Sequence, residues 1–204
     1  MPQHEMEFRV SQAEVFRRWL EDADAELGWV LNELTRDEPN EAMLRGTAFH
    51  RALELASDGL FDEVVSNGYT FLIDCDISLS LPKTREIRLR KNYGGIFISG
   101  QVDGVVGNLV IDHKTTAHFD AERYFSGFQW RFYLDIFRAN TFRWNVFEIK
   151  EEDYMTYRVT ALHVLEQYRY PDMEQDCREL AHKLRDFAQV HIVPALVGHM
   201  GETA

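Results

Sequence analysis

The sequence has little cysteine, and this excludes several kinds of site. Its 204 residues contain two cysteines, Cys75 and Cys177, which lie far apart in the chain. They do not have the paired spacing of a zinc ribbon, and they give no disulfide framework. Such sparse cysteine is typical of proteins in a reducing compartment.

Long hydrophobic runs are also missing. No apolar stretch approaches the length needed to cross a bilayer. The first ten residues, MPQHEMEFRV, lack the apolar centre of a signal peptide. We therefore expect a cytoplasmic protein with no membrane partner.

Positive charge is the third deficiency. Lysine and arginine together number 22, against 34 aspartates and glutamates, so the formal net charge is -12. This charge argues against broad electrostatic binding along a nucleic acid. It leaves room for a local basic groove, or for a phosphate site in which a metal ion supplies the positive charge.

The residues that are present fit one α/β domain. Hydrophobic residues make up 45% of the chain and charged residues 27%, enough for one well-filled core at this length. We expect residues 1–204 to form a single domain. Helical spacing predicts helices from Ser11 (with Glu14 in a capping box) to about Leu34, from Asn40 to Asp58-Gly59, from Glu122 to Ala139, and from about Asp172. Strands are predicted within Tyr69 to Arg90, interrupted at Pro82-Lys83, and at Arg143 to Lys150 and Tyr154 to Leu162.

The stretch from Gly95 to Thr116 has the pattern of a β-hairpin. Apolar residues alternate up to Gly107-Asn108 and resume after it. Glycine in the first position of a two-residue loop favours a type II′ turn. Counting back from that turn places Asp103 directly opposite Asp112, with their Cβ atoms ~5 Å apart on one face of the sheet.

Two carboxylates at this distance repel each other unless something neutralises them, and a divalent cation is the neutraliser we expect. Side chains two apart on a strand share a face, so Lys114 joins the two acids and His113 points the other way. The same register places Gln101 opposite Lys114. Two acids and one ammonium could hold a hard metal ion and a phosphate together.

Three other groups of residues each have two interpretations. The basic cluster Arg85, Arg88, Arg90 and Lys91 is either a solvated strand face or a rim that contacts phosphates. His50 and Glu54 share a helical face, where a lone histidine is more often structural than a ligand. Gln129 and Tyr133 also share a face, but it is mostly aromatic, so Tyr133 could simply belong to the core.

These residues, in chain order, resemble the motifs of a known family. The set comprises Gly46-Thr47-Ala48-Phe49-His50 with Glu54, Gly100-Gln101-Val102-Asp103, Ile111-Asp112-His113-Lys114-Thr115, and Gln129 with Tyr133. It resembles the RecB-type branch of the PD-(D/E)XK nuclease superfamily, and the helix from Ser11 resembles the usual first helix of that family. The resemblance implies an α/β fold with a restriction-endonuclease-like core, in which helices flank a central mixed β-sheet.

The resemblance also implies roles for the matched residues. His50, Asp103 and Asp112 would bind Mg²⁺ or Mn²⁺, with the main-chain carbonyl of His113 as a further ligand. Lys114 would orient or activate the attacking water. Asp112 stands where many superfamily members have glutamate, although aspartate is usual in this branch.

Other implied roles concern the substrate and the cofactor. Gln129 and Tyr133 would contact the nucleic-acid strand near the scissile phosphate, and Glu54 would support the helix face or a second metal. Some members carry a four-cysteine iron–sulfur cluster. Two cysteines cannot build one, so no cluster is expected.

The function implied is that of a metal-dependent DNA nuclease, an exonuclease that acts on DNA ends in recombination, repair or DNA processing. The chain shows no appended recognition domain and no extended basic helix to read a major groove. The alternatives are a structure-selective endonuclease, a non-catalytic nucleic-acid-binding module on the same fold, and an acidic interaction protein. DNA is the expected partner, and a recombination or single-strand-binding protein is left open as a second.

Overall fold

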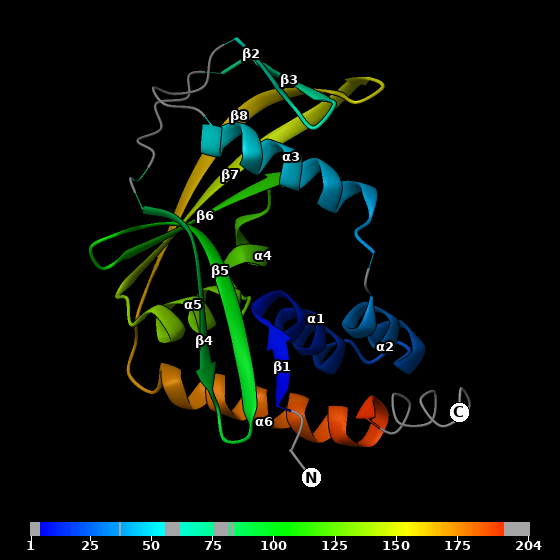
Figure 1. The fold of residues 1–204 in the computed structure, drawn as a ribbon, viewed down its shortest axis with the longest axis vertical. Helices are drawn as coiled ribbons and strands as arrows, with labels where there is room; N and C mark the ends of the chain where they lie inside the picture. The colour runs from blue at the N-terminus through cyan, green and yellow to red at the C-terminus, as the bar shows by residue number, and fades with distance from the viewer. Residues whose placement is uncertain (1–4, 37, 56–61, 76–81, 83, 194–204) are drawn as a thin grey trace.

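One mixed sheet of eight strands runs through the molecule (Figure 1). This computed structural model describes residues 5–36, 38–55, 62–75, 82 and 84–193. The strands are β1 (Met6–Arg9), β2 (Glu63–Ser66), β3 (Tyr69–Ile73), β4 (Thr84–Asn92), β5 (Ile96–Val106), β6 (Leu109–Thr116), β7 (Thr141–Asp153) and β8 (Thr156–Tyr168). The helices are α1 (Val10–Glu21), α2 (Leu27–Thr35), α3 (Glu41–Leu55), α4 (Ala121–Phe125), α5 (Gln129–Phe137) and α6 (Met173–His191). The predicted fold class, a central mixed sheet flanked by helices, is confirmed.

Strand β5 is where the order of the sheet branches. The order is β1-β5-β6-β7-β8-β3-β2, and β4 pairs with β5 outside this path. Strand β1 pairs with residues 96–99 of β5 and β6 pairs with residues 104–106, while β4 spans both ranges on the opposite edge. On the edge of β5 that faces β1 and β6, residues 100–103 therefore have no strand partner.

The predicted hairpin forms with the predicted turn. Val106 pairs with Leu109 across the two-residue loop. Gly107 has a φ of +58°, whereas Asn108 is not among the residues with positive φ, as a type II′ turn requires. Strand β6 then runs parallel to β7 along its whole length.

Two predicted helices are each broken into two. The helix expected from Ser11 to Leu34 ends at Glu21, where Asp22 turns the chain by accepting the main-chain N–H of Asp24 (3.1 Å). The predicted capping box of Ser11 and Glu14 is also wrong. Helix α1 begins at Val10, and the Gln12 side chain accepts the N–H of Arg9.

The helix expected from Glu122 to Ala139 is interrupted at residues 126–128. Gly127 lies in the interruption, and Phe128 donates its N–H outside the helix, to Glu14 (2.7 Å). The helix predicted from Asn40 does start there, since the Asn40 side chain accepts the N–H of Met43. Its predicted end at Asp58-Gly59 lies outside the described residues, as does part of the Pro82-Lys83 loop.

The strands outside the hairpin are longer or more numerous than predicted. Strands β7 and β8 run to Asp153 and Tyr168, beyond their predicted ends. The short strands β1 and β2 have too few residues to show a period in the sequence and were not predicted.

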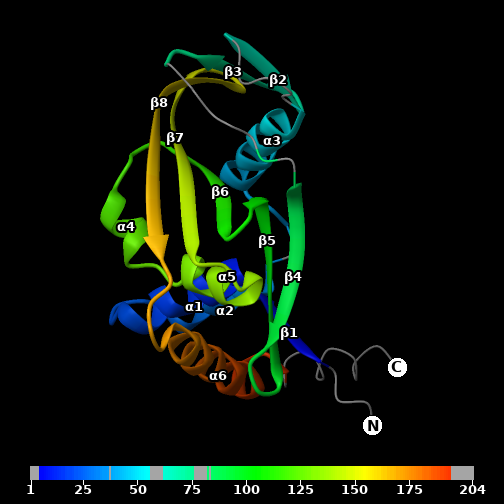
Figure 2. The ribbon, with the colours of Figure 1, turned by 90° about the vertical axis from the view of Figure 1, so that its left-hand side faces the viewer.

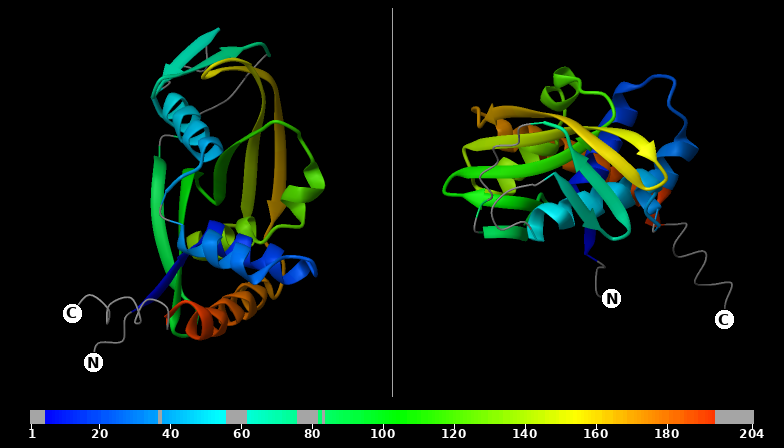
Figure 3. Two further views of the ribbon diagram at one scale, coloured as in Figure 1. Left: turned by 90° about the vertical axis from the view of Figure 1, so that its right-hand side faces the viewer. Right: turned by 90° about the horizontal axis from the view of Figure 1, so that it is seen from above.

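The helices divide the sheet into two packed regions (Figures 2 and 3). Helix α3 packs at one end, where Phe49 contacts Phe71 and Phe147 in a small aromatic core. Helices α1, α5 and α6 gather at the other end around a larger core. The hairpin end that carries Asp103 and Asp112 lies between these two cores, so each core contributes one wall to it. None of the described helices is long and apolar enough to cross a membrane.

Candidate active site

Strands β5 and β6 separate at the two predicted acids. Their ladder includes Gly104–Ile111 and stops there, so the expected Asp103–Asp112 pair does not form as part of it. Instead, the Asp103 carboxylate accepts the main-chain N–H of His113, which a continued ladder would have bonded to the main chain of β5. A side chain thus replaces a backbone acceptor and lets the strands diverge.

The predicted placement of Gln101 opposite Lys114 is wrong for the same reason. Gln101 pairs with Arg88 of β4, and its side chain bonds to Glu86. Glu86 itself has a φ of +54°, a conformation that favours glycine, at the position of β4 that faces Asp103. The hydrogen bonds of Gln101 therefore point to the outer strand.

Each acid is neutralised by a side chain of this protein. Asp103 Oδ1 lies 3.0 Å from His50 Nδ1, and Asp112 Oδ2 lies 2.8 Å from Lys114 Nζ. Asp112 is only 3% exposed, so this ion pair is largely removed from water. Two cationic groups of the chain thus balance the two acids in this structure, and the expected metal ion stays a prediction.

Burial and charge shift the pKa values of these groups. Burial favours the neutral acid at Asp103, but the hydrogen bond and charge of His50 outweigh it and lower its pKa to about 2. At Asp112 burial prevails and raises the pKa above its ordinary value. Burial also opposes the charged form of Lys114, yet the carboxylates of Asp112 and Asp103 raise its pKa.

The two histidines respond in opposite ways. Burial disfavours protonation of His50, but the Asp103 carboxylate raises its pKa above the ordinary value. Burial lowers the pKa of His113 to about 4, so this ring is neutral at pH 7. The His113 Nδ1 atom lies 3.2 Å from the Asn145 side-chain amide, which holds the ring in place.

The donor atoms suit a hard divalent cation, although they are not grouped around a common centre. Among the described residues, no three histidine, cysteine, aspartate or glutamate side chains are arranged as a metal site. However, Asp112 Oδ2 is buried and has no well-aligned hydrogen-bond donor. Carboxylate oxygens are the ligands that such cations prefer. The residues therefore fit the implied metal once the His50–Asp103 and Lys114–Asp112 pairs open.

A small cavity of about 10 Å³ lies on the His50 side of the site, and His113, Asp103 and Glu54 border it. His50 and Glu54 thus share a face, as predicted. The Glu54 carboxylate pairs with Arg51 at 2.5 Å. Lys114 lines a different cavity, which agrees with the predicted alternation between His113 and Lys114.

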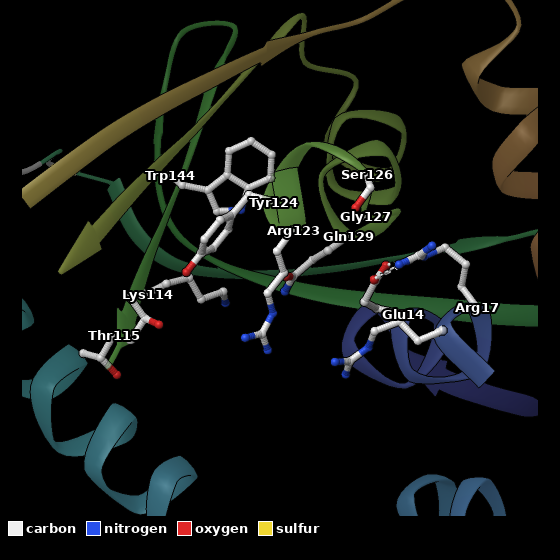
Figure 4. A pocket seen from close by; sticks show the side chains of 12 residues that line it. Glu14, Arg17, Lys114, Thr115, Arg123, Tyr124, Ser126, Gly127, Gln129 and Trp144 are labelled. Atoms are coloured by element: carbon white, nitrogen blue, oxygen red, sulfur yellow. Dashed lines mark hydrogen bonds and ion pairs between the residues drawn. The ribbon is translucent and has the colours of Figure 1, made fainter. Parts of the chain in front are cut away.

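The cavity beside Lys114 is larger, about 380 Å³, and basic (Figure 4). Helix α1 contributes Arg17 and Arg18, and α4 contributes Arg123, so four cations line it against one carboxylate, that of Glu14. Thr115 and Gln129 add polar groups, and Tyr124 with Trp144 adds aromatic surface. In Figure 4, Lys114 and Thr115 lie at one side of this cavity and Glu14 with Arg17 at the other.

Comparisons with known proteins give a fold and no sequence relative. No family model matches the sequence, and no curated protein matches it either. A phage-related exonuclease from Haemophilus somnus 129PT matches with a TM-score of 0.51 and 13% identity over 97% of each chain. A candidate exonuclease from Eubacterium rectale matches with a TM-score of 0.51 and 12% identity, over 91% of this chain and 81% of that chain.

This chain shares the fold of these two exonuclease structures. Sequence identities this low establish the fold alone, and the roles of individual residues remain predictions. Asp103, Asp112 and Lys114 come together with His50 at the branch point of the sheet, where β5 and β6 diverge.

Gln129 and Tyr133 differ in their access to the basic cavity. Gln129 lines it, as a substrate-binding residue must. Tyr133 is 6% exposed, its ring stacks on Phe142, and it packs so closely on Gly100 that a Cβ there would lie 2.7 Å from the ring. The Tyr133 ring is therefore part of the core. Its hydroxyl hydrogen-bonds with the Gln129 side chain near the two acids, and contact of Tyr133 with the strand stays a prediction.

Of the two interpretations of the basic cluster on β4, the structure favours a structural role, because its side chains have partners within the fold. Arg85 donates to the carbonyl of Glu54 (2.7 Å) and so caps the end of α3. The other three cations form ion pairs with acids: Arg88 with Glu7, Arg90 with Glu5 and Glu7, and Lys91 with Asp135 and Glu174.

The sequence did not point to the residues that make this cavity basic. Arg18 and Arg123 lie on helices far apart in sequence, and no motif connects them. The one available signal was that Tyr124 follows directly after Arg123, an aromatic residue beside a cation. Only the fold shows that α1 and α4 face the same space.

Proposed function

We propose that this protein is a divalent-metal-dependent DNA nuclease that hydrolyses phosphodiester bonds from strand ends. The observation that carries the proposal is the basic cavity beside Lys114. It brings Arg18 and Arg123, which form no ion pair among the described residues, beside the paired cations Arg17 and Lys114 in a chain whose net charge is -12. A local field of this kind attracts a phosphodiester backbone that the rest of the surface repels.

Asp103, Asp112 and His50, with the main-chain carbonyl of His113, are the groups that would hold Mg²⁺ or Mn²⁺. The bound ion supplies positive charge at the phosphate and lowers the pKa of a coordinated water. Glu54 borders the same small cavity as His50 and would support that side of the site.

Lys114 acts on the phosphate side. Its ammonium stays charged because its pKa is raised by the neighbouring carboxylates, and it lies at the edge of the basic cavity. A fixed cation there stabilises the extra negative charge that develops on the phosphorus oxygens during attack. Gln129 and Thr115 orient the strand by hydrogen bonds, and Tyr124 offers the aromatic surface that Tyr133 does not.

The comparisons support this proposal through the fold. The phage-related protein with a TM-score of 0.51 is named an exonuclease, and this chain spans 97% of its length. A role in recombination, repair or DNA processing, with a recombination or single-strand-binding protein as partner, is the cellular setting we propose for such an activity.

One observation favours a second function. Both acids are paired with cations of the chain, and no metal-type grouping exists among the described residues. A protein that keeps these pairs closed would bind a strand in the basic cavity without cutting it. A cleavage assay distinguishes the two functions, because only a nuclease hydrolyses the bound DNA.

The proposal is tested by incubating the protein with linear and circular DNA, each single- and double-stranded, with Mg²⁺, Mn²⁺ or EDTA. We expect metal-dependent loss of linear DNA and none in EDTA. Equal cutting of closed circles replaces the exonuclease with a structure-selective endonuclease. Binding without cleavage under every metal condition supports the non-catalytic module instead.

A further inference from the structure

The basic cavity is bounded, on the side away from Lys114, by a contact between elements distant in sequence. Glu14 of α1 accepts the main-chain N–H of Phe128, at 2.7 Å, just before α5 begins. The same carboxylate pairs with Arg17 at 2.8 Å. Arg17 is 8% exposed and also bonds to Glu21, so the contact is braced from within α1. We call the Glu14–Phe128 hydrogen bond the clasp.

Local chemistry explains why the clasp forms here. Phe128 precedes the first turn of α5, where main-chain N–H groups have no partner within the helix, and a carboxylate is favoured at that end. Gly127 lies directly beside the carboxylate, since a Cβ there would be in van der Waals contact with Glu14 Oε1 at 3.4 Å and Oε2 at 3.5 Å. The clasp thereby fixes the start of the helix that places Gln129 in the cavity.

The clasp limits what the cavity can accept. Its 380 Å³ is near the lower end of the range for small-molecule pockets, roughly 300–1,000 Å³. Figure 4 shows Glu14 and Arg17 opposite Lys114 and Thr115, with Arg123 between them. A strand that passes Lys114 therefore meets the joined α1 and α5. An uninterrupted strand needs a second exit on that side, whereas a strand end does not.

We propose that the Glu14–Phe128 clasp is an end stop that makes cleavage depend on a strand terminus. This inference rests on the proposed nuclease function and names the residue that determines its specificity for ends. Arg18 and Arg123 form no ion pair among the described residues, so their charges face the terminal nucleotide that the clasp stops.

The test compares closed circular single-stranded DNA with the same DNA made linear, under one metal condition. The ratio of circular to linear cleavage is measured for the wild type, Glu14→Ala, Glu14→Gln and Glu21→Gln. Glutamine can still accept from Phe128, so E14Q keeps a low ratio. In E14A the ratio rises toward one, the value for a nuclease that does not need a strand end. E21Q is the matched control, because it removes the other partner of Arg17 and leaves the clasp intact.

Several results would overturn the end stop. An E14A protein that folds and keeps the wild-type ratio shows that the clasp is only structural. A wild type that cuts circles as fast as linear DNA contradicts the end stop even if E14A does not fold; metal-dependent phosphodiester hydrolysis then still stands, as an endonuclease. If E14A is unfolded, Arg17→Gln removes the ion pair that orients Glu14 and should raise the ratio; an unchanged ratio counts against the proposal. Absence of cleavage of any linear DNA refutes the nuclease function itself.

Discussion

Lys114 Nζ lies 2.8 Å from Asp112 Oδ2, and the two side chains respond differently to this pairing. The carboxylates around Lys114 raise its pKa, so the fold stabilises its charged form. Burial raises the pKa of Asp112, so the fold disfavours its charged form. The two halves of one ion pair therefore contribute unequally to stability, and substituting them should have unequal effects.

Asp112→Asn should abolish cleavage while lowering the free energy of unfolding by less than Lys114→Met does, because burial already disfavours the Asp112 charge and the Lys114 side chain left behind is 32% exposed. Urea denaturation and a cleavage assay measure the two effects. Metal-dependent activity at the wild-type level in the folded variant would remove Asp112 from the site.

Lys114→Met should be the more destabilising change, by about 1–3 kcal/mol, because it leaves Asp103 and Asp112 without their nearby ammonium. Cleavage should fall by about 10²–10³-fold or more, since the cation acts on charge that develops in the transition state. Mn²⁺ should still raise the melting temperature of the variant. Loss of that response, seen by calorimetry in folded protein, would make Lys114 a structural counter-ion.

Substitution of Tyr133 should mainly lower stability, whereas substitution of Tyr124 should mainly weaken substrate binding. Tyr133→Ala should lower the free energy of unfolding by about 3–5 kcal/mol, as expected for a large aromatic side chain removed from a core. Tyr124→Leu keeps apolar bulk beside Trp144 and should mainly raise KM for single-stranded DNA. If instead Tyr133→Phe raises KM as much as Tyr124→Leu does, the Tyr133 hydroxyl contacts the strand.

Arg123→Gln should weaken DNA binding and reduce the slope of log affinity against log salt by about 0.7, the value for one lost phosphate contact on a single strand. Arg88→Gln is the matched control, since Arg88 lies on β4 and pairs with Glu7 at 3.8 Å. Both are measured by salt titration of binding. An equal change in slope for both variants would instead favour the interpretation of the β4 cluster as a rim that contacts phosphates.

The sequence predicted the hairpin because its information is local. Apolar alternation and a glycine turn determine the pairing as far as Gly104–Ile111. The separation of β5 from β6 could not be predicted from the sequence, because it depends on the Asp103 side chain replacing a backbone acceptor. Motif resemblance gave the fold and brought His50 to the right place, which periodicity alone could not do.

Glu14 shows why the rest was missed. In sequence it completes a capping box with Ser11, whereas in the structure it bonds to Phe128, 114 residues away. Local signals cannot rank a nearby partner against one that only the tertiary fold supplies. The same limit applied to Tyr133, which has the spacing of a ligand but lies within the core.

The most direct test of the account is the cleavage of end-labelled linear DNA by the wild type, Asp112→Asn and Lys114→Met, each with Mg²⁺ or Mn²⁺ and again with EDTA. The account predicts labelled mononucleotide or short products from the wild type with metal, none with EDTA, and at most traces from either variant. Cleavage that survives EDTA, or that both folded variants retain at the wild-type rate, would contradict the assignment of phosphodiester hydrolysis to this site.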